Sequence, residues 1–100
     1  MRNIQLTFGV NSQESNKIIL EDIIKKHQSR LALSYSAGHG FWKDGSNELC
    51  ITILSLAWKE QDDYDERLGL CMALASEISY ELNEPVTVQT IKVEGVVVIE

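Results

Sequence analysis

The sequence predicts an α+β domain in which two helices pack on one face of a four-stranded antiparallel sheet. Four segments carry the apolar patterns of strands, two carry apolar residues at helical spacing, and together they follow the order β-α-β-β-α-β. Both strand-to-helix connections are short, and a glycine-rich hairpin joins the second strand to the third. This is the order of the ferredoxin-like fold. A chain of 100 residues has room for one such domain, which we assign to residues 1–100.

The first strand and the first helix are predicted within residues 4–29. In the strand, apolar residues alternate with polar or small ones, and the apolar set is Ile4, Leu6, Phe8 and Val10. Asn11 or Ser12 can cap the helix, with Glu14 completing a capping box. The helix is expected to end near residue 29. Its inward stripe consists of Ile19, Leu20, Ile23, Ile24 and His27.

The next two strands are predicted at residues 31–37 and 48–58. The first of them alternates, whereas the second is apolar on both parities, which is typical of a strand at the centre of a sheet. Residues 38–47 hold three glycines and an Asp44-Gly45 step, so we interpret them as the connecting hairpin loop.

The second helix and the last strand complete the pattern. Asp62 or Asp63 can cap the helix, with Glu66 in its first turn, and Pro85 ends it. The helix buries a stripe made of Tyr64, Leu68, Cys71, Ala75, Ile78 and Leu82. Residues 86–99 read as one long extended segment, bent or bulged at Gly95.

Charge and composition exclude several classes of function. Nine Lys and Arg against 15 Asp and Glu give a net charge of −6, which argues against nucleic-acid binding because phosphate backbones are repelled. The sequence contains neither a signal-peptide pattern nor a membrane-spanning run, so we expect a cytoplasmic protein with no membrane contact. Cys50 and Cys71 are expected to be free thiols. No cofactor or metal is expected, because no zinc or calcium spacing occurs.

Catalysis has little support in the sequence. No nucleophile elbow, phosphate-binding loop, C-x-x-C or H-E-x-x-H motif occurs. A Cys50–His39 pair across the hairpin is disfavoured because Cys50 lies in an apolar strand, where a thiolate is costly. We therefore expect a protein that is not an enzyme.

The hairpin contains the most unusual residues of the chain. We single out His39, Phe41, Trp42 and Lys43 as a candidate binding loop. The two adjacent aromatic rings either fold back over the sheet edge or serve as anchors for a protein partner. A third interpretation joins His39 and Lys43 to the start of the first helix as an anion site.

A second candidate surface is an acidic patch at the start of the second helix, formed with Glu60 by Asp62, Asp63, Asp65 and Glu66. Acidic residues there complement the helix dipole, and they could also dock a basic partner. The topology is expected to bring Lys26, His27 and Arg30 to the same end of the sheet. Gly9, Asn11 and Ser12 are expected near the hairpin, at the other end.

The sheet face away from the helices is expected to be apolar. The third strand would contribute Cys50, Leu54, Leu56 and Trp58, and the last strand a run of valines and isoleucine. An exposed patch of that size favours self-association through the sheet, so we expect a homodimer.

The leading hypothesis is a small acidic cytosolic domain that binds another protein and self-associates, as an accessory or inhibitor protein of the kind that phages encode. The alternative is a small-molecule- or anion-binding domain, or a simple enzyme, with its site between the 38–47 hairpin and the start of the first helix. In that alternative His39 acts as acid or base and Trp42 as a stacking wall. The sequence names neither a partner nor a ligand.

Overall fold

A computed structural model of the chain describes residues 1–10, 14–57, 63–95, 97 and 99. Six elements follow one another along the chain: β1 (Arg2–Val10), α1 (Glu14–His27), β2 (Leu33–Phe41), β3 (Asn47–Ser55), α2 (Tyr64–Leu82) and β4 (Thr87–Lys92). The predicted β-α-β-β-α-β order is confirmed. None of the described helices is long and apolar enough to cross a membrane.

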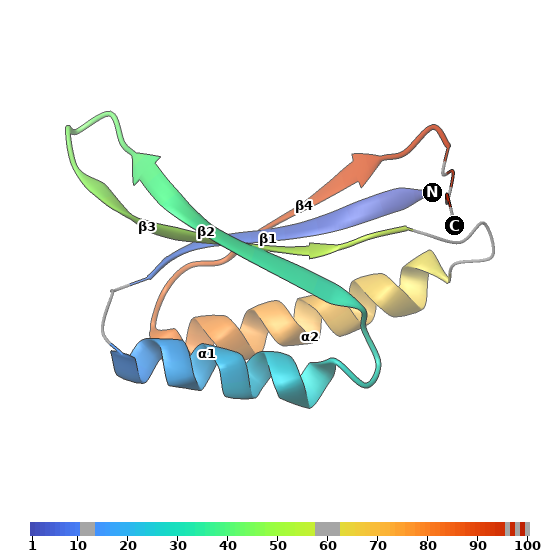
Figure 1. Cartoon of the computed structure of the whole chain (residues 1–100), viewed down its shortest axis with the longest axis horizontal. Coiled ribbons are helices and arrows are strands. Elements are labelled where there is room, and N and C mark those ends of the chain that lie inside the picture. Colours follow the sequence, from blue (N-terminus) through green and yellow to red (C-terminus); the bar gives the residue numbers. More distant parts are fainter. Residues whose placement is uncertain (11–13, 58–62, 96, 98, 100) are drawn as a thin grey trace.

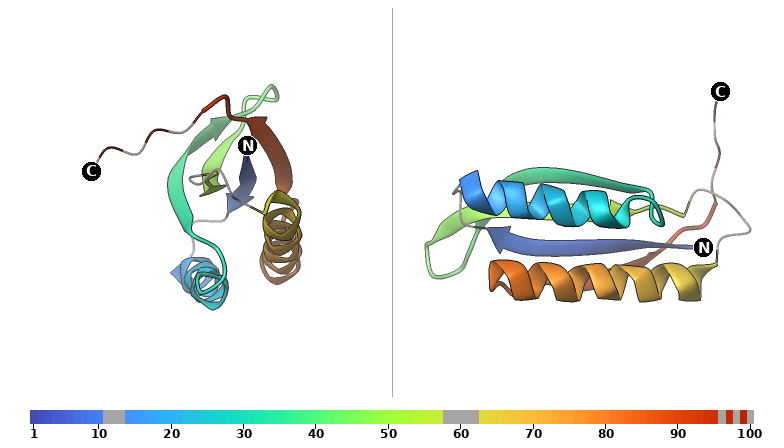
Figure 2. Two further views of the ribbon diagram at one scale, coloured as in Figure 1. Left: turned by 90° about the vertical axis from the view of Figure 1, so that its right-hand side faces the viewer. Right: turned by 90° about the horizontal axis from the view of Figure 1, so that it is seen from below.

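The strands form one antiparallel sheet in the order β2-β3-β1-β4. Both helices lie against the same face of this sheet, one beside the other, as Figures 1 and 2 show. The arrangement is the ferredoxin-like α+β fold. The N-terminus and the end of β4 lie at one end of the sheet, where the Val93 N–H donates to the Met1 carbonyl at 2.9 Å. The β2–β3 hairpin lies at the opposite end.

The core fills the space between the sheet and the helices. The four alternating apolar residues of β1 are all buried, as predicted, together with Ile51 and Ile53 of β3. The α1 stripe contributes Leu20 and Ile23, which are also buried. From α2, the buried residues are Arg67, Cys71, Leu74, Ala75 and Ile78. Amphipathic periodicity therefore predicted most of the packed surface.

Several predicted boundaries differ from the structure. Residues 38–41 continue β2 instead of belonging to the loop, because they keep pairing with β3 as far as Phe41↔Asn47. β4 spans Thr87–Lys92, so the predicted strand ends before Gly95 and does not extend to residue 99. The predicted caps Asn11, Ser12 and Asp62 lie outside the described residues. Asp63 is the N-cap of α2.

The open face of the sheet, away from the helices, is mostly polar or small, so the prediction of an apolar face is wrong. The register places the polar β1 residues Gln5 and Thr7 on this face, beside Ser34 and Ser36 of β2. β3 does bring Cys50 and Leu54 to it, as predicted. β4 ends at Lys92, before the valine-rich run, and the predicted Trp58 lies outside the described residues.

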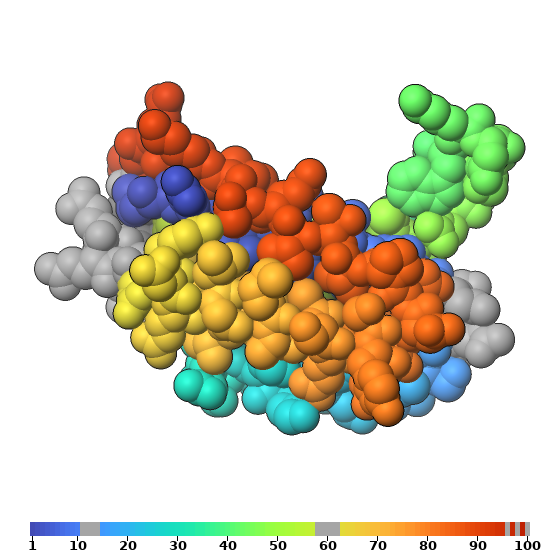
Figure 3. Space-filling model, turned by 180° about the vertical axis from the view of Figure 1, so that it is seen from behind, coloured from blue at the N-terminus to red at the C-terminus, as the bar shows by residue number. Residues whose placement is uncertain are grey.

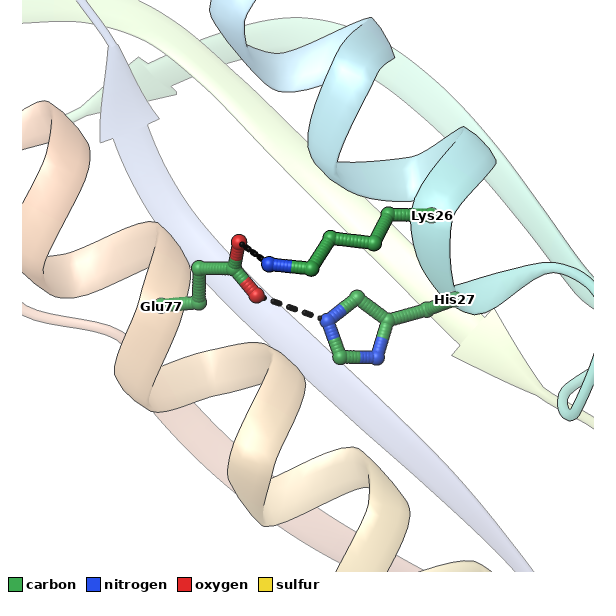
Figure 4. Close-up of polar contacts among 3 residues, drawn as sticks. All are labelled: Lys26, His27 and Glu77. Carbon is green, nitrogen blue, oxygen red and sulfur yellow. Dashed lines mark hydrogen bonds and ion pairs between the residues drawn. The ribbon is translucent and has the colours of Figure 1, made fainter.

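The two helices are joined by a cluster of polar contacts around Glu77 that was not predicted from the sequence. Lys26 Nζ and His27 Nε2 of α1 each lie 2.8 Å from a carboxylate oxygen of Glu77 in α2 (Figure 4). The expectation that these two side chains meet the acidic start of α2 is therefore wrong. Arg30 does lie near it, in a hollow that Asp63 and Glu66 also line.

Candidate functional site

The β2–β3 hairpin stands clear of the helix layer, as the space-filling view in Figure 3 shows. Its turn is held by the Trp42 N–H, which donates to the Ser46 carbonyl at 2.9 Å, and by the Gly45 N–H, which donates to the Trp42 carbonyl at 3.0 Å. Gly45 has φ 86°, a conformation that glycine adopts without strain. Asp44 Oδ1 accepts from both the N–H and the hydroxyl of Ser46, and these bonds hold the pKa of Asp44 below its ordinary value.

The turn places Trp42 beside Glu48 on the open face of the sheet. The indole Nε1–H donates to Glu48 Oε1 at 3.0 Å. A Cβ atom at Gly40 would lie 2.6 Å from Cζ2 of the indole, so the ring rests directly over this glycine. A Cβ atom at Gly9 would overlap the Glu48 carboxylate. The lack of side chains at Gly9 in β1 and Gly40 in β2 thus makes room for the Glu48 carboxylate and the Trp42 indole.

We call the set Gly9, Gly40, Trp42 and Glu48 the glycine shelf. It combines an aromatic ring that lies over Gly40 with a carboxylate that lies over Gly9. Both Trp42 and Glu48 are exposed, with 46% of the Trp42 surface accessible. An indole face and a carboxylate together attract a cation. The shelf is therefore suited to a small, positively charged ligand.

The four predicted hairpin residues do not converge on one site. His39 and Phe41 pair with Leu49 and Asn47, and so lie on the opposite face of β2 from the shelf. Their rings lie 6.5 Å apart, and Phe41 is 78% exposed. Lys43 is exposed in the turn. The predicted fold-back of the rings therefore describes Trp42 and not Phe41.

The register also separates His39 from Cys50. Gly38 is the residue opposite Cys50, on the open face, whereas His39 lies opposite Leu49 on the other face. A nucleophile–base pair of these two residues is excluded by this alternation. Both described cysteines are free thiols, as expected, with Cys50 half-buried and Cys71 buried.

The acidic patch at the start of α2 has a local structural role. Asp63 Oδ1 accepts from the Glu66 N–H at 3.1 Å and caps the helix, while Asp65 and Glu66 lie in its first turn. Asp62 lies outside the described residues. Among those described, no group of three His, Cys, Asp or Glu side chains is placed to hold a metal ion.

Sequence reasoning missed two residues with clear roles. Glu48 was treated only as the beginning of a strand, although it is the one acidic residue within β3. Arg67 was not considered at all, yet it is only 8% exposed and occupies the helical position four residues before Cys71. A charged residue at a buried stripe position is a signal that the periodicity could have provided.

The comparisons with known proteins report on the fold. No family model and no curated protein matches the chain. A phage SAM lyase in its apo state is similar in structure, with TM-score 0.63 and 18% identity over 94% of this chain and 90% of the other. A phage SAM lyase in complex with S-methyl-5′-thioadenosine gives TM-score 0.58 and 15% identity, over 89% and 78%. The designed protein Foldit4 gives 0.55 and 18%, over 93% and 98%.

Identities this low show a shared fold and nothing finer. The chain is a small ferredoxin-like α+β domain. A designed protein with the same fold illustrates that the architecture alone carries no function, so the activity must be argued from the site.

Proposed function

We propose that the chain binds S-adenosylmethionine on the glycine shelf and acts on it as a lyase, releasing S-methyl-5′-thioadenosine. The observation that carries the proposal is the fixed pairing of the Trp42 indole with the Glu48 carboxylate over Gly9 and Gly40. Support comes from two of the similar structures, which are of phage SAM lyase, one of them in complex with S-methyl-5′-thioadenosine.

The chemistry of this ligand matches the shelf. S-Adenosylmethionine carries a sulfonium cation bonded to the ribose of its adenosyl group. The sulfonium would lie against the indole face and the carboxylate, an arrangement worth about 0.5–2 kcal/mol for the cation–π contact alone. The net charge of −6 raises the local concentration of a cationic ligand around the whole domain.

Binding is tested by fluorescence titration of the Trp58→Phe protein, in which Trp42 is the remaining tryptophan. We expect S-adenosylmethionine to change the emission of Trp42 with a saturating curve. S-Adenosylhomocysteine, the neutral thioether of nearly the same shape, is expected to bind about tenfold more weakly because it lacks the sulfonium charge. A flat titration with both compounds would overturn the proposal.

The chain offers matched glycine variants for the same assay. Gly9→Ala places a methyl group where the Glu48 carboxylate lies, whereas Gly38→Ala on the same face of the sheet meets open space. We expect Gly9→Ala to weaken binding at least tenfold and Gly38→Ala to leave it unchanged. Equal effects of both variants would place the ligand elsewhere.

Cleavage is measured separately, by chromatographic detection of S-methyl-5′-thioadenosine during incubation with S-adenosylmethionine. In this step the carboxylate of the ligand's own amino-acid chain attacks the carbon bonded to sulfur, so that a C–O bond forms as the C–S bond breaks. Both electrons of the broken bond stay on sulfur, which becomes the neutral thioether, and the amino-acid chain leaves as a lactone. We expect release by the wild-type chain and loss of release in Glu48→Gln. Saturable binding of S-adenosylmethionine without release of S-methyl-5′-thioadenosine would show that the chain binds this ligand but does not cleave it.

The proposed site refines the alternative drawn from the sequence. Trp42 keeps its role as a stacking wall, but Glu48 replaces His39 as the polar group, since His39 lies on the other face of β2. The cytosolic location expected from the sequence suits a cytosolic metabolite. The expectation that the protein is not an enzyme is set aside in this proposal.

Protein binding is the second candidate, favoured by the exposure of Phe41, a large aromatic side chain near the hairpin tip. As an accessory or inhibitor protein, the chain would anchor a partner through Phe41 and Lys43, with the acidic start of α2 as a secondary contact. Phe41→Ser should then lose a partner that co-purifies with the wild-type chain, at unchanged melting temperature, and Asp65→Asn should lose it with at most a small fall in melting temperature from the weaker interaction with the helix dipole. Retention of that partner by both variants would remove this candidate.

A further inference from the structure

Among the described strands, β2 forms one edge of the sheet and pairs with β3 alone. Alternate residues of an edge strand direct their N–H and C=O groups away from the sheet, where another strand can pair with them. β2 is nine residues long, and seven of its positions are exposed to solvent in the pattern ieeeeeeie. A long, exposed edge of this kind is a template for strand addition.

The two edges of the sheet are protected to different degrees. β4, at the opposite edge, has six residues, contains Lys92 and follows Pro85. β2 contains no Asp, Glu, Lys or Arg, although 24% of the chain is charged. Charged residues and proline are the usual devices against edge pairing, so β2 lacks the protection that β4 has.

The lack of charged residues along β2 removes local repulsion between two copies of the chain at this edge. Two copies of this chain repel each other because each carries a net charge of −6. An edge without charged residues is a surface on which two copies can meet with little local repulsion. Phe41 and Tyr35, which are 78% and 47% exposed, would gain cover there.

The sequence of β2 is suited to pairing with itself. In an antiparallel arrangement centred on Ala37, Tyr35 of each copy lies opposite His39 of the other, and Leu33 lies opposite Phe41. These larger side chains all share one face of the strand. On the other face, Ser34 meets Gly40 and Ser36 meets Gly38, so only small residues oppose each other.

We propose that two copies of the chain pair through their β2 edges about a two-fold axis at Ala37, forming one continuous eight-stranded antiparallel sheet. This surface differs from the open face that the sequence suggested for self-association. It does not depend on the proposed ligand, so the two proposals fail or succeed separately.

The test is sedimentation velocity of the full chain and of matched charge variants. Ala37→Lys sets two lysines opposite each other at the axis, whereas Gln89→Lys adds the same charge to an exposed position of β4. We expect the wild-type chain and Gln89→Lys to be dimers and Ala37→Lys to dissociate at least tenfold more readily. Mixing Ala37→Lys with Ala37→Glu should restore a dimer.

Four results would overturn the proposal. The wild-type chain could remain a monomer at a protein concentration of about 100 μM, which would mean a dissociation constant weaker than that. Ala37→Lys could stay dimeric. Gln89→Lys could dissociate as readily as Ala37→Lys, or the wild type could sediment as a trimer, and either result would indicate head-to-tail pairing of β2 with β4.

A second variant guards against misfolding of Ala37→Lys. Ala37→Cys changes little in volume, and its thiols would face each other across the axis at the spacing of paired strands. Mild oxidation of Ala37→Cys should give a covalent dimer on a denaturing, non-reducing gel. Gln89→Cys, treated in the same way, should give no covalent dimer. Absence of the Ala37→Cys dimer, with the variant folded, would contradict the two-fold pairing.

Discussion

Arg67 and Ser55 are joined by two hydrogen bonds in the interior of the protein. Arg67 Nη1 donates to the Ser55 carbonyl oxygen at 3.0 Å and to its hydroxyl at 3.1 Å. Nη2 of the same side chain donates to the Arg2 carbonyl oxygen, and the guanidinium carbon lies 5.9 Å from the centroid of the Tyr64 ring. One buried cation therefore fastens α2 to the end of β3 and the beginning of β1.

Removing this cation should destabilise the fold. Arg67→Met fills a similar volume but leaves the carbonyl oxygens of Ser55 and Arg2 without their donor, so we expect a loss of about 3 kcal/mol in the free energy of unfolding. Ser55→Ala, which removes only the hydroxyl acceptor, should cost about 1 kcal/mol. Urea denaturation followed by circular dichroism measures both. A loss for Arg67→Met no larger than that for Ser55→Ala would contradict this role.

The cluster around Glu77 predicts a dependence of stability on pH. The Lys26 ammonium and, secondly, the His27 ring lower the pKa of Glu77 from its ordinary value of 4.5. The folded state therefore favours the ionised carboxylate, and its stabilisation is present above the ordinary pKa and lost as the pH falls through the lowered folded-state pKa. Glu77→Gln should be less stable than the wild type at pH 7, and the difference should vanish in acid. A difference that persists at pH 2 would disprove the linkage.

The N-cap of α2 gives a local prediction. Asp63→Ala removes the acceptor of the Glu66 N–H and should lower the free energy of unfolding by about 1 kcal/mol. Asp63→Asn keeps a capping oxygen and serves as the control, with a change of a few tenths of a kcal/mol at most. Thermal melts of the two variants compare them directly. If both variants lose stability equally, the charge of Asp63 matters more than its hydrogen bond.

The two cysteines should differ in reactivity towards a disulfide reagent. Burial raises the pKa of the Cys71 thiol, outweighing the opposite effects of Ser55 and Arg67, and also blocks access to it. Cys50 is only half-buried on the open face of the sheet. We expect one thiol to react in the native protein and the second only on unfolding, because the thiolate is the reactive form. Cys50→Ser should abolish the fast reaction, and two fast thiols in the native protein would refute this assignment.

Much of the fold could be predicted because buried apolar residues recur at every second position in a strand and at every third or fourth position in a helix. The alternation at Ile4 and Leu6 marked β1, and the helical spacing of Cys71 and Ile78 marked the inward face of α2. Strand ends were predicted less well. Pairing partners decide where a strand stops, and the sequence of residues 86–99 does not reveal that the ladder with β1 ends at Lys92.

The site was harder to predict than the fold, because it depends on register. His39 and Trp42 are close in sequence, yet strand alternation sends them to opposite faces of the hairpin. Gly9 and Glu48 are far apart in sequence, and only the pairing of β1 with β3 shows that one makes room for the other. Knowledge of the register of β1 against β3 would have identified Glu48.

The strand order also governs how the protein folds. Only β2 and β3 are neighbours both in the chain and in the sheet, whereas β1 pairs with partners as distant as Ser55 and Val88. The local hairpin can close within microseconds, but β1 must wait for long loops to close on either side, which slows folding. During synthesis on the ribosome, β1 emerges first and is completed last. Its buried residues Ile4, Leu6 and Phe8 therefore remain open to wrong partners until β4 has left the tunnel.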